Sequence, residues 1–102
     1  MRIYMTARFQ VRAEALDRCK EAIADFVDHI RREEPGTHVY AALEQSDDPT
    51  RLLHVFSFDS DRDQEVHRTS QAVKRFTEIL YPETVSGVEF QSYSLLTAKG
   101  DL

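Results

Sequence analysis

The sequence predicts an α+β fold in which one four-stranded antiparallel sheet carries its helices on a single face. Polar and apolar residues alternate over residues 2–11, which is the period of a strand. Apolar residues then recur at spacings of three and four over residues 13–33, which is the period of a helix. Two more strand-like segments follow, with turn-forming residues between them.

The first strand and the first helix each have one apolar side. In the strand this side is formed by Ile3, Met5, Ala7, Phe9 and Val11. In the helix, from about Ala13 to Glu33, it is formed by Leu16, Cys19, Ile23, Phe26, Val27 and Ile30. The segment Glu34-Pro35-Gly36 ends the helix, because proline disfavours the helical conformation in the residue before it and glycine accepts the backbone that follows.

Two strands, Thr37 to Gln45 and Arg51 to Asp59, are expected to pair as a hairpin around a turn at residues 46–50. With the turn residues outside the ladder, the expected opposite pairs are Gln45 and Arg51, Ala42 and His54, Tyr40 and Phe56, and His38 and Phe58. One hairpin face is then aliphatic, with Val39, Ala41, Leu43, Leu53, Val55 and Ser57. The other is aromatic with polar tips, with His38, Tyr40, Ala42, Leu52, His54, Phe56 and Phe58.

Neither hairpin face alternates apolar with charged side chains, as a face exposed to water would. Both faces are therefore expected to be buried. The helices of the same chain can cover only one of them, and 102 residues supply no third layer. A homodimer with its sheets face to face is the simplest cover for the second.

The remaining chain completes the fold. Ser60 or Asp61 can cap a short helix to about Thr69, and Ser70 can cap another that ends before Pro82. Val85 to Thr97 is the expected last strand, and residues 99–102 are expected to fray from a single domain of residues 1–98. The order βαββαβ is the split βαβ arrangement of the ferredoxin-like fold.

Composition excludes several classes of function. The 13 Lys and Arg against 18 Asp and Glu give a net charge of −5, the wrong sign for binding nucleic acid. No apolar run is long enough to cross a membrane, and no nucleotide-binding or zinc-protease motif occurs. A single cysteine, Cys19, cannot form an internal disulfide and is expected to be a small buried apolar residue. Arg2 interrupts the N-terminal apolar stretch, so a cytoplasmic protein is expected.

A set of segments, taken in order and spacing, points to a known family. They are Glu34-Pro35-Gly36, Tyr40, Asp48-Pro49-Thr50-Arg51, Phe58-Asp59, Glu65-Val66-His67-Arg68-Thr69-Ser70 and Phe76. Together they resemble the antibiotic biosynthesis monooxygenase domain, a family of small dimeric α/β-barrel proteins. The resemblance implies a dimer whose two sheets form a barrel, with a pocket in each subunit between the sheet and its own helices. It also implies chemistry on small aromatic or quinone-like molecules, often with molecular oxygen and with neither metal nor organic cofactor.

The chain departs from the family pattern at several positions. Phe56 stands where many members have a glutamate, Phe58 where the strand usually ends in a tryptophan, and Ala72 where a histidine often follows the short helix. At the three positions that the related haem-degrading branch needs for haem, this chain has Ala7, His67 and Thr77. A haem site is therefore not expected.

His67 is the candidate catalytic residue. By resemblance it stands where many members have a histidine, and an imidazole can take a phenolic or enolic proton near neutral pH without a metal. The alternative is a surface histidine on a polar helix, since Gln64, Glu65 and Arg68 are its neighbours. The candidate substrate-binding residues are Tyr40, His54, Phe56, Phe58 and Phe76.

For these five residues, simple packing in the core is the alternative, and for His54 or His38 it is a hydrogen-bonded core histidine. No cofactor site is expected. No metal site is expected either, because strand residues two or more pairs apart do not easily share one coordination sphere, which counts against the set of His38, Glu44, His54 and His67.

The expected function is a cofactor-independent monooxygenase acting on a small phenolic, quinol or polyketide-like substrate. His67 would remove a proton from the substrate, and the anion would then react with oxygen itself. One alternative is an isomerase of a small hydroxyketone that uses the same base. Another is a ligand-binding dimer without catalysis, which the missing glutamate at Phe56 favours.

Overall fold

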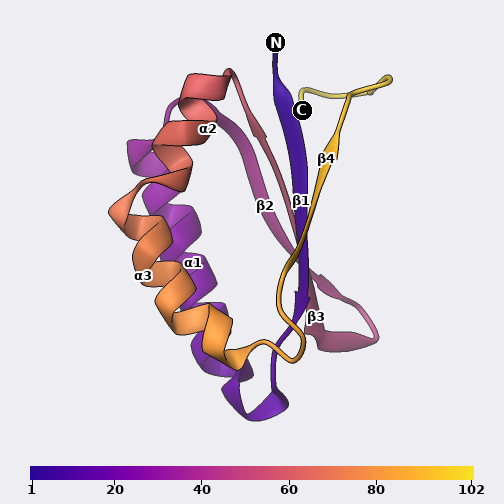
Figure 1. The fold of residues 1–102 in the computed structure, drawn as a ribbon. Coiled ribbons are helices and arrows are strands. Elements are labelled where there is room, and N and C mark those ends of the chain that lie inside the picture. The colour runs from indigo at the N-terminus through magenta and orange to yellow at the C-terminus, as the bar shows by residue number, and fades with distance from the viewer.

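The computed structural model describes residues 1–102 as a curved sheet with all helices on one side (Figure 1). The strands are β1 (Ile3–Gln10), β2 (Thr37–Gln45), β3 (Asp48–Phe58) and β4 (Glu89–Tyr93). The helices are α1 (Leu16–Glu33), α2 (Asp61–Arg68) and α3 (Gln71–Leu80), with the 3-10 turns η1 (Ala13–Ala15) and η2 (Tyr81–Glu83). The sheet order β2-β3-β1-β4, antiparallel throughout, confirms the predicted ferredoxin-like fold.

Serine caps start α2 and α3 where the sequence predicts. The Ser60 hydroxyl oxygen accepts from the backbone N–H of Asp63, and Ser70 caps α3 in the same way. The Asp63 carboxylate accepts in return from the Ser60 hydroxyl at 2.7 Å. Gly36 lies directly against Asp63, because a Cβ at this glycine would be 2.0 Å from Asp63 Oδ1. These contacts fix α2 over the loop that follows α1.

The hairpin turn is shorter than predicted. The turn consists of residues 46–47, and β3 begins at Asp48, so Gln45 pairs with Asp48 and not with Arg51. The reason lies in the side chain of Asp48, which accepts hydrogen bonds from the backbone N–H of Thr50 at 3.1 Å and from its hydroxyl at 2.6 Å. A register shift between Glu44 and Gln45 accommodates this shorter turn.

The middle of the hairpin has the predicted register. Ala42 lies opposite His54, and Tyr40 lies opposite Phe56. A second register shift near the start of β2 changes the last expected pair, because Thr37, rather than His38, lies opposite Phe58.

The last strand is also shorter than the predicted Val85 to Thr97. Gly87 has a φ of +88°, which turns the chain just before β4 begins. Tyr93 pairs with Tyr4, and β1 begins at Ile3, so residues beyond Ser94 would run past the start of β1.

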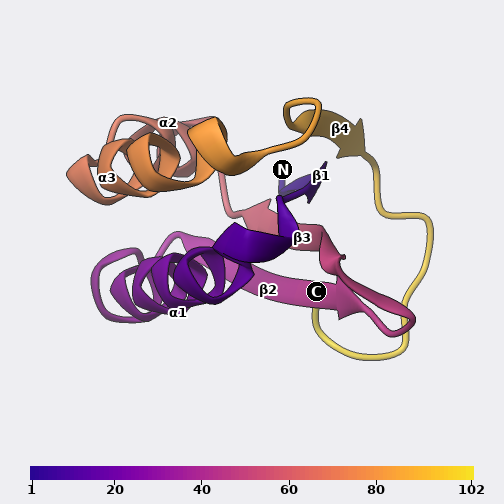
Figure 2. The same ribbon diagram turned by 90° about the horizontal axis from the view of Figure 1, so that it is seen from below.

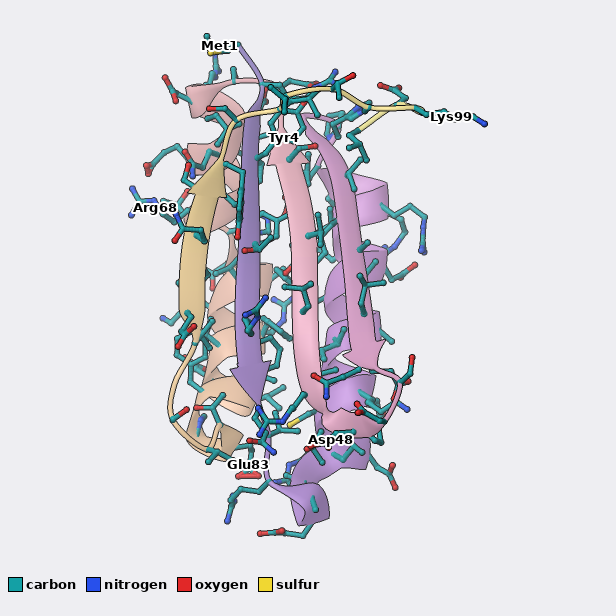
Figure 3. The ribbon with its side chains drawn as sticks, turned by 90° about the vertical axis from the view of Figure 1, so that its right-hand side faces the viewer. Met1, Tyr4, Asp48, Arg68, Glu83 and Lys99 are labelled. Carbon is teal, nitrogen blue, oxygen red and sulfur yellow. The ribbon has the colours of Figure 1, made fainter.

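Residues 94–102 leave the sheet edge and run along its open side (Figure 2). The carbonyl oxygen of Leu102 accepts hydrogen bonds from the Arg2 guanidinium at 2.7 Å and from the Tyr4 hydroxyl at 3.3 Å. The segment that the sequence predicts to fray therefore lies at the end of the sheet that carries Met1 and Tyr4, away from Asp48 in the hairpin (Figure 3).

The two faces of the sheet differ in burial within the single chain. On the helix-covered face, Leu52, His54, Phe56 and Phe58 are buried. On the opposite face, which Figure 3 shows toward the viewer, the aliphatic residues are half-buried and Leu43 is 51% exposed.

At the lower end of the helical layer, buried Glu83 pairs with Arg12 and Arg18, which ties η2 to the start of α1. No helix has the length and apolarity to span a membrane.

Candidate functional site

A cavity of about 70 Å³ lies between the helix-covered face of the sheet and the three helices. Its walls are largely aromatic, and the rings come from every layer that surrounds it: Phe9 on β1, Phe26 on α1, Tyr40 on β2, Phe56 on β3 and Phe76 on α3. The polar side chains in the wall are Tyr40, His54, His67, Thr77 and Tyr81. The cavity therefore combines an apolar lining with a few polar groups, as ligand sites do.

Two stacked ring pairs shape the cavity. Phe26 and Phe76 stack with their centroids 4.3 Å apart and 6° between planes, and Tyr40 and Phe56 stack at 5.0 Å and 15°. Phe26 also meets Tyr40 edge-on at 5.4 Å. Flat walls of this kind suit a planar ring.

His67 is placed at this cavity by α2, with the imidazole turned inward from a polar helix. Its side chain is 12% exposed, and the rings of Phe26 and Phe58 lie 5.5 and 5.1 Å from its own. Nδ1 lies 2.8 Å from Oε1 of Glu34. A largely buried, hydrogen-bonded histidine replaces the alternative of a surface histidine.

Glu34 is the residue that sequence reasoning missed. It is 5% exposed and accepts hydrogen bonds from His67 Nδ1 and from the Thr37 hydroxyl, both at 2.8 Å. Its other oxygen, Oε2, lies 3.8 Å from Nε2 of His29. Burial alone would raise the pKa of Glu34, but the hydrogen bonds from His67 and Thr37 outweigh burial and lower it. Glu34 is therefore a buried carboxylate at neutral pH.

The carboxylate determines which nitrogen of His67 is free. An ionised carboxylate only accepts hydrogen bonds, so Nδ1 of His67 carries the proton and donates a hydrogen bond to Glu34. In the neutral ring, Nε2 then carries a lone pair. The carboxylate also stabilises the positive charge that appears when Nε2 takes a proton. This arrangement is suited to a general base.

His54 occupies another part of the wall. It is 1% exposed, and its Nδ1 lies 2.7 Å from the hydroxyl oxygen of Tyr40. Burial lowers the pKa of His54 to about 4 and raises that of Tyr40. Both groups are therefore uncharged at neutral pH, in contrast to Glu34.

The structure does not bring every predicted residue to the cavity. Phe58 is buried behind His67 and Phe56 and is absent from the cavity wall. His38 lies outside it, with Nε2 3.2 Å from Asp101. Cys19 is fully buried in the core, as expected. No three His, Cys, Asp or Glu side chains are arranged to hold a metal ion.

The cavity is small in this conformation, since ligand sites commonly measure about 300–1,000 Å³. A volume of about 70 Å³ admits water-sized molecules. A planar aromatic ligand therefore requires wall side chains to move. Tyr81 and Phe90, which are 46% and 56% exposed, are the least confined rings in the wall.

A larger hollow of about 630 Å³ lies at the hairpin end of the sheet, among Arg8, Gln45, Arg51 and Gly87. Its wall is mostly polar, and neither His54 nor His67 contributes to it. Of the two, the smaller cavity has apolar walls around groups that can exchange protons.

Comparison with known proteins gives a consistent family assignment. A family model described as antibiotic biosynthesis monooxygenase matches residues 2–79. Among curated proteins no match is found.

Solved structures share the fold over nearly the whole chain. A protein of Bacteroides thetaiotaomicron, provisionally named an antibiotic biosynthesis monooxygenase, superposes with a TM-score of 0.91 at 15% identity and covers 99% of this chain and 95% of its own. A provisionally named counterpart from Nitrosomonas europaea gives a TM-score of 0.87 at 19% identity, with coverages of 97% and 94%. The protein Rv0793 of Mycobacterium tuberculosis gives 0.87 at 18% identity, with coverages of 98% and 100%. At these identities the similarity shows the fold.

Proposed function

Because the chain belongs to the antibiotic biosynthesis monooxygenase family, we propose that it is a cofactor-independent monooxygenase of a small phenolic, quinol or polyketide-like substrate, with His67 as the base. One observation carries the proposal. Nδ1 of His67 is held by the buried carboxylate of Glu34 at 2.8 Å, which leaves the lone pair of Nε2 for a ligand in the aromatic cavity.

The proposed reaction begins when Nε2 of His67 takes the proton of a phenolic hydroxyl. The resulting phenolate has electron-rich ring carbons next to and opposite its oxygen. At such a carbon, which still carries a hydrogen, the electron pair forms a C–O bond to molecular oxygen, the co-substrate. The distal peroxide oxygen then takes back the proton from His67. Loss of water breaks the O–O bond and leaves a second carbonyl, so one phenol and one O₂ give one quinone and one water.

The protein contributes orientation, a base and a dry pocket in this account. The rings of Tyr40, Phe56 and Phe76 hold the substrate plane, and the apolar walls keep bulk water from the anion. Phe58, which the sequence places among the substrate-binding residues, acts here as support behind His67.

Oxygen consumption by the purified protein tests the proposal. An oxygen electrode records uptake across a panel of phenols and quinols, with each substrate's spontaneous oxidation subtracted. We expect at least one substrate to consume one O₂ per quinone formed. Binding without oxygen uptake or product across the panel would contradict the oxygenase and support a non-catalytic binding protein.

The cavity volume favours a second candidate, an isomerase of a small hydroxyketone. A molecule of a few heavy atoms needs less rearrangement of a cavity of about 70 Å³ than a quinol does. Nε2 of His67 would then move a proton between adjacent carbons, with no oxygen consumed. Proton exchange from solvent deuterium into a hydroxyketone, without oxygen uptake, distinguishes this reaction.

The open sheet face supports a homodimer as the partner arrangement. Val39, Ala41, Leu53 and Val55 are half-buried there although no helix covers them, and Leu43 is exposed. A second copy packed face to face would remove these residues from water. Val55→Asp would place an unpaired charge in that interface and abolish association in sedimentation experiments. A wild type that sediments as a monomer at micromolar concentration would refute the dimer.

A further inference from the structure

One residue of the cavity wall carries a buried polar atom that lacks a partner. Four buried side-chain atoms of the protein make no hydrogen bond: Glu34 Oε2, His38 Nε2, His54 Nε2 and Ser57 Oγ. The first two still lie within 4 Å of an ionisable partner, His29 and Asp101 respectively. Of these residues, only His54 lines the cavity. Buried polar atoms without partners are uncommon, since an unmade hydrogen bond costs free energy. An unpartnered nitrogen on a residue of this aromatic cavity points to a ligand atom as its missing partner once the wall side chains have moved.

The hydrogen bond from Tyr40 determines what that nitrogen offers. Nδ1 of His54 lies 2.7 Å from the Tyr40 hydroxyl, which has no other hydrogen bond. The phenol is the more acidic group, so its O–H donates to Nδ1. A neutral imidazole has one donor and one acceptor nitrogen, which leaves the proton on Nε2. His54 therefore carries an N–H donor that has no partner within the protein, whereas Nε2 of His67 carries a lone pair.

We propose that Nε2–H of His54 binds an oxygen atom of the ligand, and that Tyr40 is the positioning residue that holds His54 in the required tautomer. As a statement about substrate, this rests on the proposed function. With one oxygen ionised by His67 and another bound by His54, the substrate class narrows to planar rings that carry two oxygens, such as quinols and hydroxylated aromatic ketones.

The charged side chains near the cavity restrict the class of ligand further. No Lys or Arg contributes to its wall. A carboxylate or phosphate would enter without a counter-charge, which is costly in an apolar site. A neutral N–H donor suits a carbonyl or hydroxyl oxygen and also stabilises negative charge that develops on that oxygen during reaction. The favoured ligand is therefore uncharged when it enters.

A matched pair of small ligands tests the proposal without turnover. Acetophenone carries a carbonyl oxygen, and α-methylstyrene replaces that oxygen with a CH₂ group of similar size. Calorimetry or fluorescence gives both dissociation constants for the wild type and for His54→Phe. We expect the substitution to weaken acetophenone about tenfold and α-methylstyrene less than twofold, since the difference corresponds to one hydrogen bond. His38→Phe, a strand histidine outside the cavity, should change neither.

Nitrogen NMR of histidine-labelled wild type provides a test that needs no variant to fold. We expect the His54 ring to carry its proton on Nε2 at neutral pH, and Tyr40→Phe to change this tautomer population. A proton on Nδ1 in the wild type would overturn the proposal, as would equal effects of His54→Phe on both ligands or no effect on either. Absence of oxygen uptake across the phenol panel, by contrast, would refute only the proposed oxygenase.

Discussion

At the α2 end of the cavity an imidazole meets a carboxylate, whereas at the β2–β3 hairpin an imidazole meets a phenol. His54 is buried and His67 is largely buried, and both are hydrogen-bonded through Nδ1 and surrounded by aromatic rings. The ring of Tyr40 lies between these environments, 5.8 Å from His67 and 5.4 Å from His54 by centroid. The two ends differ chiefly in the partner of Nδ1.

That difference gives the same side chain two different chemistries. Glu34 is ionised, so it accepts from Nδ1 of His67 and stabilises the charged ring. Tyr40 is neutral and donates to Nδ1 of His54, where burial favours the uncharged ring. One end of the cavity can therefore take a proton, and the other can only donate a hydrogen bond.

Removal of the base should have the largest effect. His67→Ala should lower turnover by roughly 10²–10⁴, the usual contribution of a positioned general base, while ligand binding changes far less because the aromatic walls remain. His67→Gln should be similarly impaired, since an amide accepts a hydrogen bond but does not hold the proton. Oxygen uptake and ligand titration measure the two quantities. Full turnover in a folded His67→Ala would show that His67 is not the base and that the substrate ionises unaided or through another group.

Neutralising the carboxylate should have the next largest effect. Glu34→Gln can still accept from Nδ1 of His67 but no longer stabilises a charged ring, so kcat should fall about 10- to 100-fold, the equivalent of one hydrogen bond to a charged group. KM should change little, because Glu34 is not part of the cavity wall. Glu65→Gln, an exposed glutamate on α2, is the matched control and should retain full activity. Equal kcat in both variants would reduce Glu34 to a structural role.

His54, which pairs with the phenol of Tyr40, should make the stability of the fold depend on pH. Unfolded chains bind a proton at His54 below about pH 6.5, whereas the folded protein does so only near pH 4. The unfolded state therefore gains protons first, and stability falls as the pH drops through this window. At about 1.4 kcal/mol per pKa unit the loss is roughly 3 kcal/mol.

Denaturant unfolding between pH 7 and pH 4 measures this loss. His54→Phe should flatten the dependence, and His38→Phe should preserve it. Glu34 is distinguishable, because its lowered pKa makes its contribution disappear only at more acidic pH. A His54→Phe protein with an unchanged pH profile between 6.5 and 4 would show that His54 is not held neutral by the fold.

A substitution at Gly36 should disturb the His67 end of the cavity and leave the His54 end unchanged. Gly36→Ala places a methyl group against Asp63, which must shift together with the start of α2. Overpacking of this kind costs about 1–3 kcal/mol. His67 is carried by α2, so turnover should fall along with stability, while the tautomer of His54 in nitrogen NMR should stay the same. A change confined to His54 would contradict the division of the site.

Much of this architecture could be predicted because local patterns determine it. The alternation in β1, the apolar side of α1 and the serine caps at Ser60 and Ser70 require no knowledge of distant residues. The end of β4 could not be predicted, since it depends on where β1 offers a partner to Tyr93. The short turn likewise depends on hydrogen bonds made by the Asp48 side chain.

Only part of the candidate site could be predicted from the sequence. His67 and Tyr40 stand out by resemblance, but Glu34 is naturally interpreted as the last residue before a helix-ending proline. Its partner is 33 residues further along the chain, and the two meet only because α2 packs on the loop after α1. The signal that could have found Glu34 was a carboxylate within one of the segments that carry the resemblance.

The most direct test of the central claim is a crystal structure of the protein with a quinol, such as 1,4-dihydroxynaphthalene, bound in the absence of oxygen. The account predicts the ring between the aromatic walls of the cavity, with Tyr81 or Phe90 displaced and one oxygen within about 2.6–3.2 Å of Nε2 of His67. A quinol bound in the hollow beside Arg8 and Arg51, or in the cavity with both oxygens beyond reach of His67, would contradict it.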